Sequence, residues 1–277
     1  MSYPYFFIFK ENINESGIEI INDDLKHLSQ VLRAKPGDLV EISDNINYRY
    51  LTEIIDIKKN RAELKIISKS EIKKSLIEIY LFQCILKRSS MELVIQKAAE
   101  IGLNAVIPVK STRVVASEKE GNHKLARWQK IALEASKQSK RDFKCEVLNE
   151  LIIKNVNPSG FDVFYVPFEE ENPIEIRRRN IVNSLKAIIE DYRKSQKGKN
   201  STNDFTGKAD CNKLPGNKNE KLKVGFIIGP EGGFEEKEVE FLTKNGAVPI
   251  SLGSNILKAE TAAIFMSSII KYILEIY

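Results

Sequence analysis

Residues that build metal sites and disulfide frameworks are scarce in this sequence. Its 277 residues include three cysteines, Cys84, Cys145 and Cys211, and two histidines, His27 and His123. The cysteines are scattered, odd in number and without a C-x-x-C pair. The sequence therefore predicts reduced thiols, with neither a disulfide framework nor a metal site.

Long apolar runs and targeting signals are also missing. No run approaches the ~18 uninterrupted apolar residues of a membrane-spanning helix. The opening MSYPYFFIFKENIN has neither the basic region nor the small-residue cleavage site of a signal peptide. Hydrophobic residues make up 42% of the chain and charged residues 29%, as in an ordinary globular protein. We therefore expect a cytoplasmic protein without membrane contact.

The net charge of +5 originates in one segment. Residues 193–223 hold nine Lys or Arg against three Asp or Glu, which leaves a net charge of −1 for the rest of the chain. The segment has too few apolar residues to offset the entropy lost on ordering, so we predict a disordered insertion. The global charge therefore says little about binding partners.

Two strand–loop–helix units follow each other in Val224–Tyr277. A strand of the buried type ends at Gly229 and another at Gly253, and the chain continues into the loops Gly229–Phe234 (GPEGGF) and Leu252–Thr261 (LGSNILKAET). Ligands of open α/β sheets bind beyond the carboxyl ends of the strands. The two loops therefore predict one small-molecule pocket.

Neither loop carries the residues of a phosphate site. The first lacks the lysine and hydroxyl of a Walker loop, and Pro230 and Glu231 break the dinucleotide fingerprint. An acidic glycine loop favours a neutral or cationic ligand. The interpretation as a nucleotide-binding α/β enzyme is therefore weak. Spacing alone fits an ordinary strand-to-helix turn equally well, with Glu235 and Glu236 at the positive end of the next helix.

Short strand patterns fill residues 1–75, and one helix is predicted over Asp24–Leu32 with three leucines at helical spacing. The five predicted strands are Tyr5–Phe9, Gly17–Ile21, Leu39–Ser43, Tyr48–Ile57 and Arg61–Ser68. The pattern predicts a small β-barrel over residues 1–75, followed by an α/β domain over residues 76–277.

A βαβ unit is predicted at the start of the second domain. It consists of a strand at Leu76–Leu86, a helix opened by the capping box Ser89–Glu92 and closed at Gly102, and a strand at Ala105–Val109. A further strand at Phe161–Phe168 is expected to end near the same pocket.

A helix with a basic face is predicted over Lys124–Arg141. Residues 110–144 hold ten Lys or Arg against four Asp or Glu. Such a face can neutralise phosphates without reading sequence. A solvated helix surface is the commoner origin of this pattern, so without other observations we favour that interpretation. The inward-facing positions are Leu125, Trp128, Ala132 and Ala135.

The two loops closely resemble the carboxyl-terminal half of SPOUT-class RNA methyltransferases, and specifically the ribosomal RNA small subunit methyltransferase E family. In that family a GPEGGF loop and an LG-x-x-ILRAETA loop hold S-adenosylmethionine. Lys258 replaces the usual arginine of the second loop, which keeps the charge but loses the planar fork. Further matching blocks are His27–Ile42, Lys87–Val115 and Arg127–Arg141.

The resemblance implies a fold, a reaction and partners. The family carries an N-terminal PUA-like RNA-binding β-barrel and a trefoil-knot α/β methyltransferase domain, and it acts as a homodimer. It methylates N3 of a uridine in 16S rRNA. The cofactor-binding residues implied are Pro167, Ile228, Gly229, Pro230, Glu231, Gly232, Ser251, Leu252, Gly253, Ile256 and Leu257. The RNA-binding residues implied are Arg33, Arg88, Arg113, Arg127 and Arg141.

The general base is left open. Glu231 and Glu260 are the acids of the two loops, but either can instead fix loop geometry, and we favour that structural role. A family arginine ahead of the first aromatic pair is replaced by Tyr5, so its contact cannot be transferred. The alternative function is a non-catalytic RNA-binding ribosome-assembly factor with a vestigial cofactor pocket, which the change at Lys258 leaves open.

Overall fold

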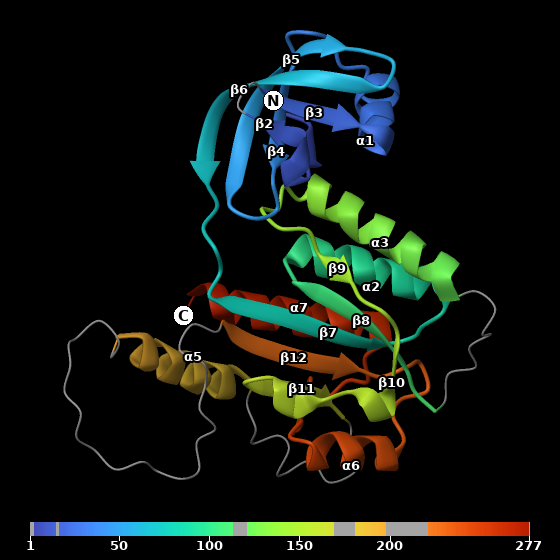
Figure 1. Cartoon of the computed structure of the whole chain (residues 1–277). Helices are drawn as coiled ribbons and strands as arrows, with labels where there is room; N and C mark the ends of the chain where they lie inside the picture. Colours follow the sequence, from blue (N-terminus) through green and yellow to red (C-terminus); the bar gives the residue numbers. More distant parts are fainter. Residues whose placement is uncertain (1–2, 15–16, 113–120, 169–180, 198–220, 277) are drawn as a thin grey trace. The chain divides into compact units, whose positions relative to one another are not determined.

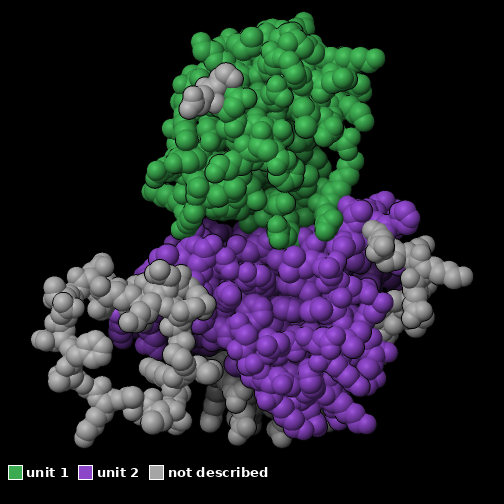
Figure 2. Space-filling model, viewed as in Figure 1, with its two compact units in different colours: residues 1–74, 129–146 green, residues 75–128, 147–277 purple. Residues whose placement is uncertain are grey.

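The structure divides into two compact units, residues 1–74 with 129–146 and residues 75–128 with 147–277 (Figure 2). Helix α3 (Gly121–Gln138) crosses the boundary, so its two halves belong to different units. The division predicted from sequence did not assign residues 129–146 to the first unit. The computed structural model describes residues 3–14, 17–112, 121–168, 181–197 and 221–276.

A six-stranded sheet forms the first unit (Figure 1). Its strands are β1 (Tyr5–Phe7), β2 (Ile13–Asn14), β3 (Gly17–Ile21), β4 (Leu39–Ser43), β5 (Tyr48–Ile57) and β6 (Arg61–Glu71). They are ordered β1-β4-β5-β6-β3-β2, and β1 is parallel to β4 while the other pairs are antiparallel. Two register shifts between β5 and β6 bend the sheet, so that residues of β1, β3, β4, β5 and β6 share one apolar core. All five predicted strands are present.

The predicted helix of the first unit consists of an α-helical part and a π-helical part. Helix α1 (Asn22–Lys26) continues as a π-helical turn over His27–Val31, in which the Leu32 N–H donates to the His27 carbonyl five residues earlier. The wider turn changes the direction of the following side chain. Leu28 is fully buried as predicted, whereas Leu32 is 41% exposed instead of facing the core.

A seven-stranded sheet forms the second unit. Its strands are β7 (Ile77–Cys84), β8 (Ala105–Lys110), β9 (Glu146–Val147), β10 (Leu151–Ile152), β11 (Val163–Pro167), β12 (Leu222–Ile228) and β13 (Val248–Ile250). Six of them follow the order β10-β8-β7-β12-β11-β13 with parallel neighbours, and β9 pairs with β8. The carboxyl ends of β7, β12, β11 and β13 therefore lie side by side at one edge of the sheet.

Four further helices pack on this sheet. They are α2 (Arg88–Ile101), α5 (Ile181–Lys197), α6 (Glu236–Lys244) and α7 (Ala259–Ile276). Helix α6 buries Val239 and Leu242 in one apolar cluster with residues of β7, β8, β11 and β12. Helices α2 and α7 pack on each other and on the sheet, and they take no part in that cluster. Short 3-10 turns lie at Lys10–Asn12, Ile153–Asn155 and Pro158–Gly160.

The start of α2 differs from the prediction. Its N-cap is Lys87, without a side-chain cap, and not Ser89. The capping box does not form there because the helix begins at Arg88, which places Ser89 inside it, and Glu92 instead accepts hydrogen bonds from Arg88 and Arg127. A capping box does form at α6, where Glu235 is the N-cap and Glu238 is its partner. The predicted C-cap of α2 is confirmed, since Gly102 has a φ of 109°.

The segment 193–223 is bounded by regular structure. Helix α5 reaches Lys197 and β12 begins at Leu222, so both ends of the predicted insertion are helix or strand. Residues 198–220 lie outside the described residues. Among the residues that are described, no helix is long and apolar enough to cross a membrane.

Candidate active site

A cavity of about 670 Å³ opens in the second unit where β11, β12 and β13 end. Four parts of the chain form its wall: the start of α2, the end of β11, the loop after β12, and the loop that leads into α7. Its volume is in the range of roughly 300–1,000 Å³ typical of small-molecule sites. The lining residues are Lys87, Ser90, Pro167, Phe168, Ile228, Gly229, Pro230, Glu231, Gly233, Phe234, Leu252, Ile256, Leu257, Lys258, Ala259, Glu260 and Ala262.

The loop after β12 is held in one shape by its own residues. The Gly233 N–H donates to the Pro230 carbonyl at 2.9 Å, and Gly233 has a φ of 71°, which a residue with a side chain adopts only with strain. The Phe234 ring is buried and approaches Gly229 so closely that an added Cβ there would lie 3.2 Å from it. Gly229 and Gly233 therefore allow a compact loop with its backbone against the cavity.

A carboxylate joins this loop to α2. The Lys87 N–H donates to Glu231 Oε1 at 3.0 Å. Lys87 is the N-cap of α2, and the first N–H groups of a helix have no partner within the helix. The Glu231 carboxylate also lies at the positive end of the helix dipole. Both contributions favour the structural role of Glu231 over a catalytic one.

A second carboxylate fixes the other end of the loop. Glu238 is buried and accepts hydrogen bonds from the Glu235 N–H and the Thr112 N–H, both at 2.9 Å, and from Thr112 Oγ1 at 3.1 Å. It therefore connects the chain beyond β8 to α6. Burial, and then the nearby Glu238 carboxylate, raise the pKa of the Cys84 thiol, so this cysteine at the end of β7 stays a neutral thiol.

The loop before α7 is stabilised by a local serine turn. Ser251 Oγ donates to the Gly253 carbonyl at 3.1 Å, and Gly253, with a φ of 129°, has its N–H 3.3 Å from the same hydroxyl oxygen. Ile256 borders the cavity but is 85% exposed. The N-terminus of α7 then brings Lys258 and Glu260 to the wall. The cavity thus combines apolar walls and glycine backbone with two lysines and two glutamates, which fits an amphiphilic ligand.

Most of the predicted ligand-binding residues border this one cavity. Eight of the eleven line it, whereas Gly232, Ser251 and Gly253 lie in the same loops but not among the lining residues. The residues that line the cavity from the sequence-predicted set are Pro167, Ile228, Gly229, Pro230, Glu231, Leu252, Ile256 and Leu257. Both acid candidates, Glu231 and Glu260, are in the wall.

The contribution of α2 was missed. Lys87 and Ser90 line the cavity although the sequence analysis assigned neither of them to it. They come to the site because β7 pairs with β12, so that Gln83 and Ile228 are neighbours at the ends of these strands. The signal that could have located them is the end of a strand, since β7 ends at Cys84 shortly before Lys87.

Two of the arginines predicted to bind RNA share one carboxylate in the second unit. Arg127 donates to Glu92 through Nε at 2.6 Å and through its second amino group at 2.9 Å. Arg88 Nε donates to the same Glu92 at 3.2 Å. The hydrogen bond from Arg127 is the main cause that lowers the pKa of Glu92. Arg113 lies outside the described residues.

The other two predicted arginines belong to the first unit. Arg33 is exposed and has a φ of 53°, a conformation that costs energy for a residue with a side chain. Arg141 follows the end of α3 and is partly buried, and burial lowers its pKa. The predicted basic face of α3 is also partly neutralised, because Lys137 is buried and pairs with Asp24 at 2.6 Å and with Glu134 at 3.1 Å.

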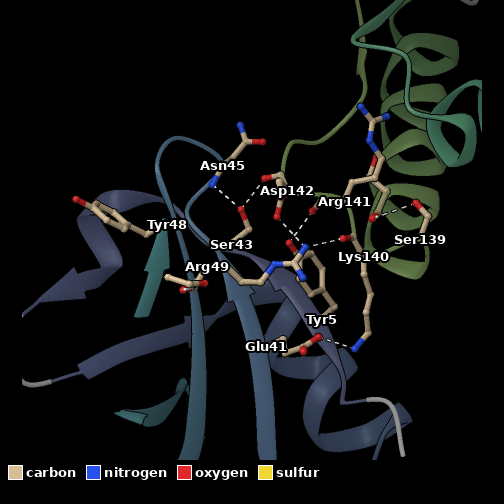
Figure 3. A network of polar contacts seen from close by, with 12 residues as sticks. Tyr5, Glu41, Ser43, Asn45, Tyr48, Arg49, Ser139, Lys140, Arg141 and Asp142 are labelled. Atoms are coloured by element: carbon tan, nitrogen blue, oxygen red, sulfur yellow. Dashed lines mark hydrogen bonds and ion pairs between the residues drawn. The ribbon is translucent and has the colours of Figure 1, made fainter. Parts of the chain in front are cut away.

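The backbone around Arg141 is tied to the β-sheet of the first unit (Figure 3). Tyr5 Oη donates to the Arg141 carbonyl at 2.6 Å, and Ser43 Oγ donates to the Asp142 carbonyl at 2.7 Å. Arg49 donates to the Lys140 carbonyl at 2.8 Å and to the Asp142 carboxylate at 2.7 Å. These bonds explain why the turn after α3 belongs to the first unit, and they give Tyr5 a structural role.

Comparisons with known proteins agree with this architecture. The family described as RNA methyltransferase domain matches residues 73–180 and 176–271, and the family described as RNA methyltransferase PUA domain matches residues 20–67. A curated relative, the ribosomal RNA small subunit methyltransferase E of Bacillus subtilis, is 28% identical over 98% of this chain and 97% of its own length.

Two solved structures share the fold across 98% of both chains, each at 22% identity and a TM-score of 0.74. One is a methyltransferase from Legionella pneumophila in complex with S-adenosylmethionine. The other is the ribosomal RNA small subunit methyltransferase E of Neisseria gonorrhoeae bound to the same compound. The predicted fold class is thereby confirmed: a SPOUT-type α/β domain preceded by a PUA-like β-barrel. The trefoil knot within that fold stays a prediction.

Proposed function

We propose, from the premise that this chain belongs to the RNA methyltransferase family, that it methylates the RNA of the small ribosomal subunit with S-adenosylmethionine as methyl donor. More specifically, the acceptor is N3 of a uridine in 16S rRNA. The single observation that carries the proposal is the cavity of about 670 Å³ between the GPEGGF loop and the loop that leads into α7. Both predicted cofactor loops meet there.

The cavity fits S-adenosylmethionine in its chemistry as well as in its size. Ile228, Leu252 and Leu257 supply apolar surface, and the backbone of the glycine loop supplies hydrogen-bonding groups without a phosphate-binding lysine. Glu231 and Glu260 add negative charge to the wall, and Lys87 and Lys258 add positive charge, which suits a ligand that carries charges of both signs. When bound, the cofactor supplies a methyl group that its sulfonium has already activated.

The protein contributes two things to the reaction: it aligns the nucleophile with the methyl group, and it removes a proton. Holding the nucleophile against the methyl group supplies much of the acceleration in such transfers. The uracil N3 atom also has to lose its proton. Of the two carboxylates in the wall, Glu231 is engaged by the Lys87 N–H, so Glu260 is the better placed candidate for the base. The target base has to be single-stranded or turned out of a helix to enter.

We propose a homodimer that forms through α7. This helix is apolar nearly all round, and its buried side carries Met266 and Ile270. On another side Phe265 is 42% exposed and Tyr272 is 68% exposed. A second copy of the chain would cover these residues, because a helix that is apolar on all sides is normally buried. We place the reaction in the cytoplasm because the proposed substrate is ribosomal RNA.

Calorimetric titration with S-adenosylmethionine tests the cavity. Ala259 lines it, so Ala259→Trp should fill it and abolish measurable binding. Ala126→Trp is the matched control, since Ala126 is exposed on α3, and it should bind like the wild type. Equal affinity of both variants would exclude this cavity as the cofactor site.

Methyl transfer separates the two functions that the sequence left open. With labelled S-adenosylmethionine and unmethylated small-subunit particles, the enzyme should place one methyl group on N3 of a uridine. A chain that binds the particles but transfers no methyl group would instead be the non-catalytic assembly factor. Nuclease digestion and nucleoside analysis of the product would identify the modified atom.

A further inference from the structure

We propose that Glu92 is a positioning residue that holds Arg88 and Arg127 as one phosphate-binding fork beside the cavity. The inference rests on the proposed function, since the phosphate belongs to the RNA that carries the target base. It gives a role to a carboxylate that belongs neither to the two loops nor to the predicted set of RNA-binding residues.

The geometry of the cluster is that of one acid shared by two arginines. Arg127 contacts both oxygens of Glu92, at 2.6 and 2.9 Å, in the bidentate arrangement that fixes a guanidinium plane. Arg88 reaches the first of these oxygens from one turn earlier on α2, at 3.2 Å. A single side chain therefore sets the orientation of cations from two helices, α2 and α3.

Exposure separates the roles of the three side chains. The Glu92 side chain is only 20% exposed, whereas Arg127 is 50% exposed and Arg88 is 73% exposed. The acid thus lies beneath the two guanidinium groups, which face solvent. Each guanidinium has five N–H donors, and the contacts with Glu92 use two from Arg127 and one from Arg88. The cluster keeps a net charge of +1 and retains donors for an anion.

The position of the cluster suits a nucleotide that enters the cavity. The start of α2 contributes Lys87 and Ser90 to the cavity wall, and Arg88 belongs to the same first turn, although Arg88 and Ser90 face different sides of the helix. A base that enters the cavity brings its own backbone phosphates to the rim. Arginine pairs recognise phosphate by parallel hydrogen bonds, and their strength depends on the orientation of the guanidinium planes. Contacts of this kind fix the register of the RNA rather than its sequence.

A purely structural role for Glu92 makes a different prediction. Ion pairs at the protein surface typically contribute 0 to about 1 kcal/mol to stability. If Glu92 only joined α2 to α3, its loss would lower stability slightly. The loss would also remove a negative charge beside the RNA, and RNA binding would then become tighter. The positioning role predicts weaker binding, so the sign of the change separates the two.

The experiment measures equilibrium binding of small-subunit particles by filter retention, together with KM and kcat for methyl transfer. Glu92→Gln should raise the dissociation constant and KM for the particles about tenfold, which corresponds to about 1.4 kcal/mol. The affinity for S-adenosylmethionine and kcat should not change. Glu240→Gln on α6 is the charge-matched control, because Glu240 likewise pairs with an exposed cation, Lys244, and it should leave RNA binding unchanged.

A second variant tests the same arrangement in case Glu92→Gln does not fold. Arg127→Lys keeps the charge but loses the planar fork, and should weaken RNA binding to a similar degree. The double variant with Glu92→Gln should be no weaker than either single variant, because both remove the same arrangement. Glu92→Asp keeps the charge on a shorter side chain and should restore part of the affinity.

Unchanged or tighter binding of RNA by Glu92→Gln would overturn the inference. So would additive losses in the double variant. These results leave the proposed function intact as long as the wild type transfers methyl groups. A wild type that binds the particles without methyl transfer would refute the proposed function instead, and the binding assay would still decide the role of Glu92. A wild type that does not bind the particles refutes both.

Discussion

The backbone N–H of Lys87 donates to the Glu231 carboxylate at 3.0 Å and thereby joins the N-terminus of α2 to the loop that follows β12. Both residues line the cavity. The contact is possible because β7 and β12 are paired in the sheet, which brings the ends of these two strands together. An acid in a glycine loop thus acts as the partner of a helix N-terminus.

The first prediction concerns this contact. Glu231→Ala removes the acceptor and should release the loop, with an affinity for S-adenosylmethionine about tenfold lower, the effect of losing one charge-assisted hydrogen bond. Glu231→Gln keeps an acceptor oxygen in place and should retain most of the affinity. Calorimetry measures both. If Glu231→Gln bound the cofactor normally but lost methyl transfer, Glu231 would be the proton acceptor and its structural role would be secondary.

The second prediction concerns the other acid of the wall. Glu260→Gln should lower kcat about 10²- to 10⁴-fold, the usual contribution of a general base, with an unchanged affinity for the cofactor. The residual activity should rise with pH, because hydroxide or an ionised uracil replaces the missing base. A rate–pH profile of the variant checks this. A variant with wild-type kcat would show that the proton leaves by another route.

The third prediction concerns the hydroxyl group of Tyr5 in the first unit. Tyr5→Phe removes the O–H that donates to the Arg141 carbonyl at 2.6 Å, but it keeps an aromatic ring 5.3 Å from the Arg49 guanidinium. Unfolding by urea should show a stability loss of about 1 kcal/mol, the typical net contribution of such a bond. Cofactor binding in the second unit should not change. A loss well above this value would mean that the whole turn at Lys140–Asp142 comes loose.

The fourth prediction concerns stability at alkaline pH. Burial raises the pKa of Cys145 to about 11, from an ordinary value of about 9. Below pH 9 the thiol is protonated in both the folded and the unfolded state. Between pH 9 and 11 only the unfolded state loses the proton, so the free energy of unfolding falls with rising pH by about 1.4 kcal/mol per pH unit from this group.

Urea unfolding at several pH values between 8.5 and 10.5 measures this slope. The wild type and Cys145→Ala should differ in slope, with the variant less steep, whatever the change in overall stability. The buried Cys84 thiol has its pKa raised in the same direction and remains in both proteins, so it cancels in the comparison. Parallel curves would show that Cys145 ionises as readily in the folded protein as in the unfolded one.

The fifth prediction tests the dimer. Tyr272 is 68% exposed in the single chain, and Tyr272→Glu would place a charge in the proposed interface. Sedimentation should show a dimer for the wild type and a monomer for the variant, because an unpaired charge in an apolar interface is costly. Lys237→Glu, on the exposed side of α6, is a control that should remain dimeric. A wild type that sediments as a monomer would reject the interface.

The sequence by itself determined the strands of both units except the two-residue strands β2, β9 and β10. It also determined the order of strand, loop and helix in Val224–Tyr277 and the pair of loops that border the cavity. These features depend on local periodicity and on glycines at turns, which act over a few residues. Gly233 and Gly253 illustrate this, since each has the positive φ that its loop requires.

Only the tertiary structure decided which distant residues meet. It brought Lys87 and Ser90 to the cavity and assigned residues 129–146 to the first unit. It also paired Glu92, which was predicted to cap α2, with Arg127. Sheet pairing and ion pairing join residues that lie far apart in the chain, and the local pattern around either partner does not encode them. The same charged side chain can face solvent, cap a helix or bind an arginine, and the choice depends on what the fold places beside it.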